Sequence, residues 1–231
     1  MLGLPEKQKT GTLVPGEEAL QNIGAEPFQR WAKEVADRSV TLVRDEQKIL
    51  PLSPKKQKRI YLNVIQKSAS PEDAFALSWK KRLEKEGFEV TLRDRRTTIE
   101  PSDFSNPNLS AEKKKLMDDL YRPVEKMKAS YDLYLYVCNM QNASNNTTLR
   151  LNWNVVFGLG DDAPWFVEEV PTIMISTGDP YHLFDAPMIK TYINVYSSDP
   201  RFCDATMDKI MGRSSFQGVS PIDPLCGKDY L

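Results

Sequence analysis

The run YDLYLYVCN (131–139) limits the fold of this chain more than any other stretch, because nearly all of its side chains are apolar. A strand with one face in water alternates apolar and polar residues, whereas a run without alternation is typical of a strand covered on both faces. Further β-prone runs are RIYLNVI (59–65), EVTLRDR (89–95), VPTIMIST (170–177) and IKTYINVYS (189–197). Helical patterns separate several of them. This alternation predicts a mostly parallel sheet between two layers of helices.

Helix signals support this alternation. In SASPEDAFALSWKKRLEKEGF (68–88), Ser70 is expected to cap the helix, Pro71 to occupy its first turn and Gly87 to end it. Residues 110–127 predict a second helix, and Pro123 inside it should kink or break it, since proline removes a backbone donor. Asp199 is expected to cap a last helix, which Gly212 closes.

Two segments leave their structure open. From Phe28, apolar residues at helical spacing predict a helix that ends near Arg44, yet its last part, SVTLV (39–43), also suits a strand. TLRLNWNVVFGLG (148–160) fits either a helix or a strand.

The domain organisation follows from composition. Residues 1–27 are rich in Gly, Pro, Lys and Glu, which indicates an extended arm or linker, and residues 28–231 hold the alternating elements. We therefore expect one α/β domain: a three-layer sandwich with a mostly parallel sheet of about five or six strands, helices on both faces, and an N-terminal arm.

Charge and cysteine usage exclude several classes of function. The net charge is −1, so no basic field points to nucleic acid. The three cysteines, Cys138, Cys203 and Cys226, are widely spaced without a CxxC pair, which argues against a zinc site. Neither a phosphate-binding loop nor a dinucleotide fingerprint occurs, so we expect no metal and no cofactor. No apolar run approaches the length of about 18 residues that a membrane span needs.

The best candidate site is the segment that follows the central run, NMQNASNNTTLRLNW (139–153). In open α/β sheets, ligands gather at the carboxyl ends of strands, where this segment begins. A glycosylation site and a plain turn are the alternatives. The candidate ligand-binding side chains are neutral amides and hydroxyls with one cation: Asn139, Asn142, Ser144, Asn145, Asn146, Thr147 and Arg150.

Catalytic groups are sparse. His182 is the single histidine, in the turn-rich TGDPYHLFDAP (177–187), where a pair with Asp179 or Asp185 is one hypothesis and a structural role the other. Glu168 and Glu169 are weak candidates for an acid, because adjacent carboxylates usually mark solvated surface.

Three segments resemble glycoside hydrolase family 3. WAKEVADRSVTLVRDEQKILPL (31–52) is similar to the entry of that family's C-terminal domain. VPTIMISTGDPYHLFDAPMIKTYINVYSSDP (170–200) and GRSSFQGVSPIDP (212–224) resemble its last strands, last helix and tail. The opening MLGLPEK resembles the end of the catalytic barrel and the linker after it. The resemblance spans essentially the whole chain.

The resemblance implies an accessory role. Enzymes of this family usually pair an α/β sandwich with a TIM-like barrel that carries the nucleophile and most of the sugar pocket. Retaining hydrolysis needs a nucleophile and an acid/base, and the barrel is missing here, so this chain alone is expected to be inactive. The β-glucosidase branch takes its acid/base Glu from a loop beyond a central strand, but residues 139–160 contain no Asp or Glu. The closer resemblance is to β-N-acetylhexosaminidase-like members, whose acid/base is on the barrel. We expect this domain to brace the barrel and to line the edge of its carbohydrate cleft. The sequence gives no localisation.

Overall fold

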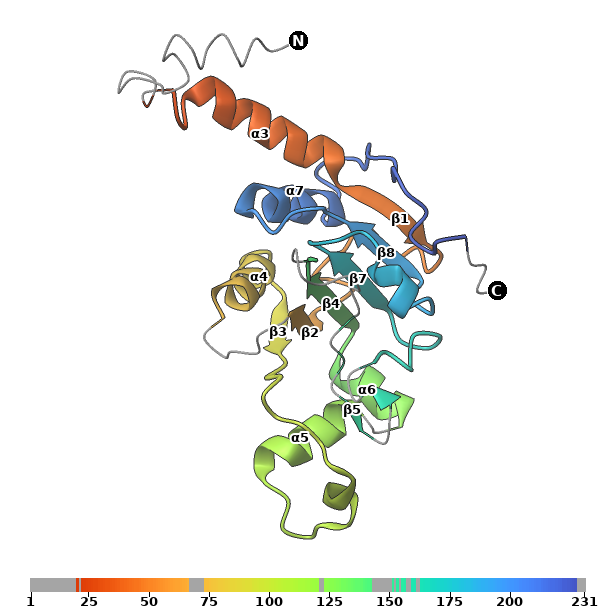
Figure 1. Ribbon diagram of the computed structural model, residues 1–231. Helices are drawn as coiled ribbons and strands as arrows, with labels where there is room; N and C mark the ends of the chain where they lie inside the picture. Colours follow the sequence, from red (N-terminus) through yellow and green to blue (C-terminus); the bar gives the residue numbers. More distant parts are fainter. Residues whose placement is uncertain are drawn as a thin grey trace, which may run out of the picture.

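A six-stranded sheet forms the centre of the molecule in the computed structural model (Figure 1). The structure describes residues 20, 22–66, 73–120, 123–142, 151, 153, 155–156, 159–160 and 163–227. The strands are β1 (Thr41–Asp45), β2 (Arg59–Gln66), β3 (Glu89–Leu92), β4 (Leu133–Asn139), β7 (Thr172–Ser176) and β8 (Thr191–Asn194). Their spatial order is β1-β8-β7-β4-β2-β3. Five strands run parallel, and β1 pairs antiparallel with β8.

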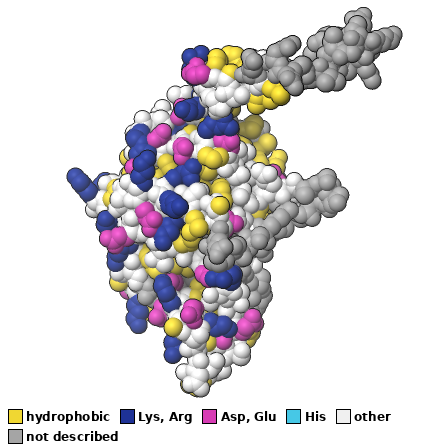
Figure 2. All heavy atoms as spheres, turned by 90° about the vertical axis from the view of Figure 1, so that its left-hand side faces the viewer, with side chains coloured by type: hydrophobic (Ala, Val, Ile, Leu, Met, Phe, Trp, Pro, Cys, Tyr) yellow, Lys and Arg dark blue, Asp and Glu magenta, His cyan; other side chains and the backbone are white. Residues whose placement is uncertain are grey.

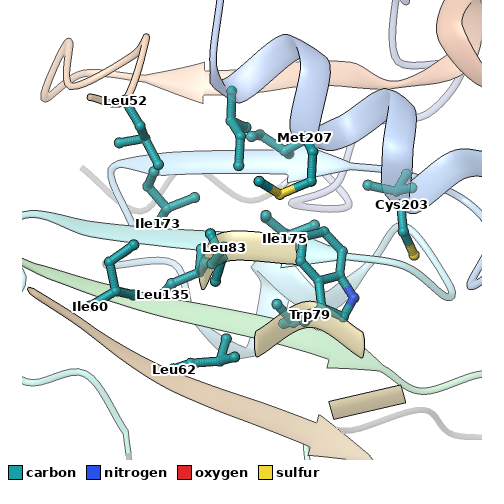
Figure 3. Close-up of a cluster of buried hydrophobic side chains, with 14 of the residues drawn as sticks. Leu52, Ile60, Leu62, Trp79, Leu83, Leu135, Ile173, Ile175, Cys203 and Met207 are labelled. Atoms are coloured by element: carbon teal, nitrogen blue, oxygen red, sulfur yellow. The ribbon is translucent and has the colours of Figure 1, made fainter. Parts of the chain in front are cut away.

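One face of the sheet is covered by helices α4 (Ala74–Lys85) and α7 (Pro200–Ile210), and α3 (Glu26–Ser39) packs against α7. Figure 3 shows Trp79 and Leu83 of α4 packing over the aliphatic side chains of the central strands. Both are fully buried. Burying large apolar side chains between helix and sheet supplies the main free energy that holds these layers together.

The opposite face is aromatic. Tyr61, Tyr134, Tyr136 and Tyr192 project from the strands and are buried under α5 (Ala111–Leu120), α6 (Val124–Ser130) and the loop that carries Phe166. The ring centroids of Tyr134 and Phe166 are 4.4 Å apart. Because both faces are covered, the expected three-layer α/β sandwich with a mostly parallel sheet is confirmed.

Pro123 breaks the second predicted helix, as expected. The structure has α5 and α6 in its place, with Pro123 at the N-cap of α6. The first helix gives way to strand at Thr41, so the end of SVTLV is extended. The segment left open at 148–160 contains two short strands, β5 (Val155–Val156) and β6 (Leu159–Gly160), which pair antiparallel.

The predicted cap of α4 was wrong. Asp73, not Ser70, is its N-cap: Asp73 Oδ1 accepts hydrogen bonds from the N–H groups of Phe75 and Ala76 at 2.8 and 3.0 Å. Ser70 and Pro71 lie outside the described residues. Gly87 has a φ of +95°, which fits the predicted left-handed end of the helix.

Candidate functional site at the carboxyl edge of the sheet

The strand order places a switch point between β2 and β4. The chain leaves β2 for β3 on one side and returns to β4 on the other, so the connections that follow β2 and β4 depart in opposite directions. Gln66 and Asn139 end these two strands and are register partners. In open α/β sheets, the crevice at such a point is where ligands bind. The start of the Asn-rich segment therefore occupies a favourable place for a ligand, although binding itself stays a prediction.

Hydrogen bonds from the loop after β7 fix the start of this segment. The N–H of Thr177 donates to the carbonyl of Cys138 at 2.8 Å, and the N–H of Asp179 donates to the carbonyl of Met140 at 3.1 Å. In return, the N–H of Asn142 donates to Asp179 Oδ2 at 2.9 Å. The backbone of 138–142 is thus tied to the neighbouring strand and the loop after it, which fixes the Cα positions from which Asn139 and Asn142 project.

Gly178 permits this close approach. A Cβ atom at Gly178 would lie 2.0 Å from the carbonyl oxygen of Met140, much closer than van der Waals contact allows. Only a residue without a side chain fits between the two loops. The turn signal in TGDP was visible in the sequence, but its contact with Met140 was not.

The structure describes two of the candidate ligand-binding side chains. Asn139 is half-buried, and its Oδ1 accepts a hydrogen bond from Thr177 Oγ1 at 3.4 Å. Asn142 is exposed. The other candidates lie outside the described residues: Ser144, Asn145, Asn146, Thr147 and Arg150.

His182 lies beneath this edge, in the 3-10 helix η2 (His182–Asp185), and is 1% exposed. Its Nδ1 lies 2.7 Å from Ser176 Oγ, which itself donates to the carbonyl of Asp179 at 2.8 Å. A hydroxyl has one proton to give, so we assign the proton of the ring to Nδ1, with Ser176 as its acceptor. His182 thus contacts a hydroxyl instead of the carboxylate of Asp179 or Asp185.

Burial lowers the pKa of His182 from 6.5 to about 4, and the nearby charge of Asp179 only partly opposes this. The imidazole is therefore neutral at pH 7. A neutral, buried ring bonded to a serine serves to hold η2 against the sheet. This geometry supports the structural role for His182 over the acid/base hypothesis.

Glu168 and Glu169 lie at the opposite edge of the sheet from Asn139, where the Asn-rich segment begins. They come just before β7, at the amino edge of the parallel strands, whereas Asn139 is at the carboxyl edge. Both side chains are exposed, and they form surface ion pairs with Lys190 and Lys128, respectively. The structure does not bring these carboxylates together with the candidate site.

The described part of the chain contains no cluster of three or more His, Cys, Asp or Glu side chains that could hold a metal ion. Cys138 and Cys203 are buried thiols, and burial raises the pKa of Cys203 to about 11. None of the helices in these residues has the length and hydropathy that crossing a membrane requires.

Comparison with known proteins identifies the type of domain. No family model matches the chain. It is similar to the structure of a β-glucoside phosphorylase, BglX, with 39% identity over 93% of this chain and a TM-score of 0.74. It is also 29% identical over 223 residues to the β-N-acetylglucosaminidase/β-glucosidase of Cellulomonas fimi. The fold recurs in a family 3 β-N-acetylglucosaminidase from a Paenibacillus strain, at 14% identity and a TM-score of 0.51. The chain is a domain of the glycoside hydrolase family 3 C-terminal type.

This family 3 domain is one part of the relatives it matches. The chain spans 35% of the phosphorylase, 36% of the Cellulomonas protein and 32% of the Paenibacillus enzyme. The relatives therefore continue for about twice the matched length. Their activities belong to those whole proteins.

Proposed function

We propose that this domain is the accessory domain of a β-N-acetylhexosaminidase-like family 3 glycosidase, bracing a TIM-like catalytic barrel and lining the edge of its carbohydrate cleft. The similarity to the BglX phosphorylase carries this proposal: it includes nearly all of this chain but only about a third of that one. The name of the Cellulomonas relative includes β-N-acetylglucosaminidase activity, which supports an amino sugar as substrate.

The chemistry of the carboxyl edge supports an accessory role. Residues 139–160 contain no carboxylate, so this segment supplies no acid/base group for glycoside cleavage. Amides such as Asn139 and Asn142 offer both donors and acceptors, which suit sugar hydroxyls. Holding such amides in place on a sheet edge positions a substrate without reacting with it.

An activity assay of the 231-residue chain tests whether catalysis requires the barrel. We expect no turnover of aryl N-acetylglucosaminides or aryl glucosides by this chain alone, and robust turnover would contradict the proposal. In the barrel-containing protein, Asn142→Ala should raise KM several-fold with little change in kcat. This substitution removes the side chain but keeps the N–H that bonds Asp179. Asn108→Ala, at an exposed loop elsewhere, is the matched control.

The switch point favours a second candidate, a stand-alone module that binds a sugar at the strand ends. Calorimetry of this chain with amino sugars distinguishes the two. Saturable binding that Asn142→Ala weakens would favour the module, whereas the accessory domain should show no measurable affinity without the barrel.

The weaker alternative, a β-glucosidase-type domain that donates Glu168 or Glu169, has its own test. Each residue is replaced by Gln in the barrel-containing protein. Loss of activity that azide rescues would support that role. Their position at the amino edge predicts that both variants keep full activity.

A further inference from the structure

Helix α3 carries a second apolar stripe that nothing in the described chain covers. Ala36 faces α7 and is fully buried, as the inner face of an amphipathic helix should be. Phe28, Trp31 and Val35, at spacings of three and four residues, are nevertheless 47%, 54% and 57% exposed. A surface helix of a soluble protein normally has one apolar stripe, so an additional exposed stripe marks an interaction surface.

Trp31 and Val35 of this stripe form one wall of a groove of about 770 Å³. The other wall is the tail after α7, where Val219 is 86% exposed and Pro221 lies beside it. Tyr196, just beyond the end of β8, also lines the groove. Figure 1 shows α3 at the top of the molecule and the tail running down beside β1. Figure 2, which views the opposite side from the tail, shows some hydrophobic side chains exposed near the upper end of the molecule.

Buried contacts fix α3 and the tail, which form the two walls of the groove, relative to α7 and β1. Lys209 of α7 has a fully buried side chain, and its Nζ donates to Asp37 Oδ1 of α3 at 3.0 Å and to the carbonyl of Ser215 in the tail at 2.7 Å. At Gly218 a Cβ atom would lie 2.4 Å from Thr41 Oγ1, so the tail is packed directly on the start of β1. A rigid groove loses little conformational entropy on binding.

The groove lies on the same edge of the sheet as the candidate site. Thr41 begins β1 opposite Asn194, the last residue of β8, and Asn194 pairs with Ser176 at the end of β7. The charges at its rim compensate one another, since Arg38 and Glu34 form an ion pair at 3.3 Å. An apolar groove without net charge fits a protein surface.

We propose that this α3–tail groove is the surface on which the catalytic barrel docks, an inference that rests on the proposed function. Two observations favour the barrel over a second copy of this chain. The relatives extend well beyond the matched third, so their folds supply a large neighbouring domain. The apolar exposure also continues past the N-terminal end of α3 to Ile23, which is 76% exposed, in the direction of the linker.

Hydrogen–deuterium exchange tests the docking. Residues 26–39 and 216–221 should exchange about tenfold more slowly in the barrel-containing protein than in the 231-residue chain. Val35→Asp should abolish that difference. Phe104→Asp, a residue that is 47% exposed in η1 (Pro101–Ser105), should leave it unchanged.

The two proposals fail in different ways. An active barrel-containing enzyme in which α3 exchanges as fast as in the 231-residue chain would overturn the docking surface and leave the proposed function standing. A barrel-containing protein without glycosidase activity would overturn the proposed function. A dimer of the 231-residue chain that Val35→Asp dissociates, seen by light scattering, would assign the groove to a second copy instead.

Discussion

Acidification should destabilise this domain through its single histidine before most carboxylates respond. In the unfolded chain His182 has its ordinary pKa of 6.5, whereas burial lowers the native pKa to about 4. Between these values the unfolded state binds a proton that the native site excludes, so stability is present near pH 7 and is lost as the pH falls through this window. From pH 7 to pH 5 the linkage relation gives a loss of about 2 kcal/mol, and the full window gives about 3 kcal/mol.

The histidine contribution can be isolated by substitution. Urea unfolding of the wild-type chain and of His182→Gln is compared at pH 7, 6 and 5. The variant should be less stable at pH 7, because it loses the 2.7 Å contact between His182 Nδ1 and Ser176 Oγ and because glutamine does not fill the buried space of the ring. Its stability should nevertheless fall by much less between pH 7 and pH 5. Carboxylates with lowered pKa values, such as Asp199 at about 2, affect both proteins equally and act mainly at lower pH.

Parallel pH dependences in the two proteins would refute this reasoning. That outcome would mean that His182 is hydrated or protonated in the native state. A direct check is the NMR chemical shift of its ring, which should stay that of a neutral imidazole down to about pH 5.

Other substitutions test the packing, each by urea unfolding. Asp37→Ala should cost about 2 kcal/mol or more, because it leaves the buried ammonium of Lys209 without its carboxylate; Lys209→Met should cost less, since the half-exposed Asp37 can be hydrated. If Lys209→Met costs more than Asp37→Ala, the ion pair with Asp37 is not what stabilises the buried Lys209 ammonium. Trp79→Ala should cost about 3–5 kcal/mol, because it leaves a cavity under α4. A loss below about 1 kcal/mol would show that the helix and the sheet move together and fill this cavity. Asp73→Ala should cost about 1 kcal/mol through the lost cap, whereas an unchanged midpoint would place the helix start elsewhere.

The layered fold could be predicted because its cause is local in the sequence. A run such as 131–139 can be satisfied only where both faces are covered, and the proline at 123 and the glycine at 87 act through their own backbones. The residues at which helices and strands begin and end depend on distant partners in the chain. Thr41 is extended because it pairs with Asn194, more than 150 residues away, and a helical pattern in SVTLV cannot reveal that.

The position of the candidate site, at the end of the central strand, could be predicted from the sequence, but the contacts that build it could not. That polar residues follow the central strand could be read from the sequence, and the switch point explains why the place matters. The ties that hold it come from the loop after β7, and each joins residues nearly forty positions apart. Periodicity and composition contain no information on such contacts.

Asp179 shows why an acid near the site need not be a catalyst. The structure brings two carboxylates to the Asn-rich segment: Asp179 Oδ2 accepts the N–H of Asn142, and Asp185 Oδ2 accepts the N–H of Leu151 at 2.7 Å. The backbone carbonyl of Asp179 accepts the hydroxyl proton of Ser176, which in turn holds His182. A general acid must present its proton to the leaving group, whereas this carboxylate is an acceptor for the backbone of the loop that it supports. The structural use of Asp179 thus agrees with the proposal that the amides of this edge orient a substrate while another domain supplies the chemistry.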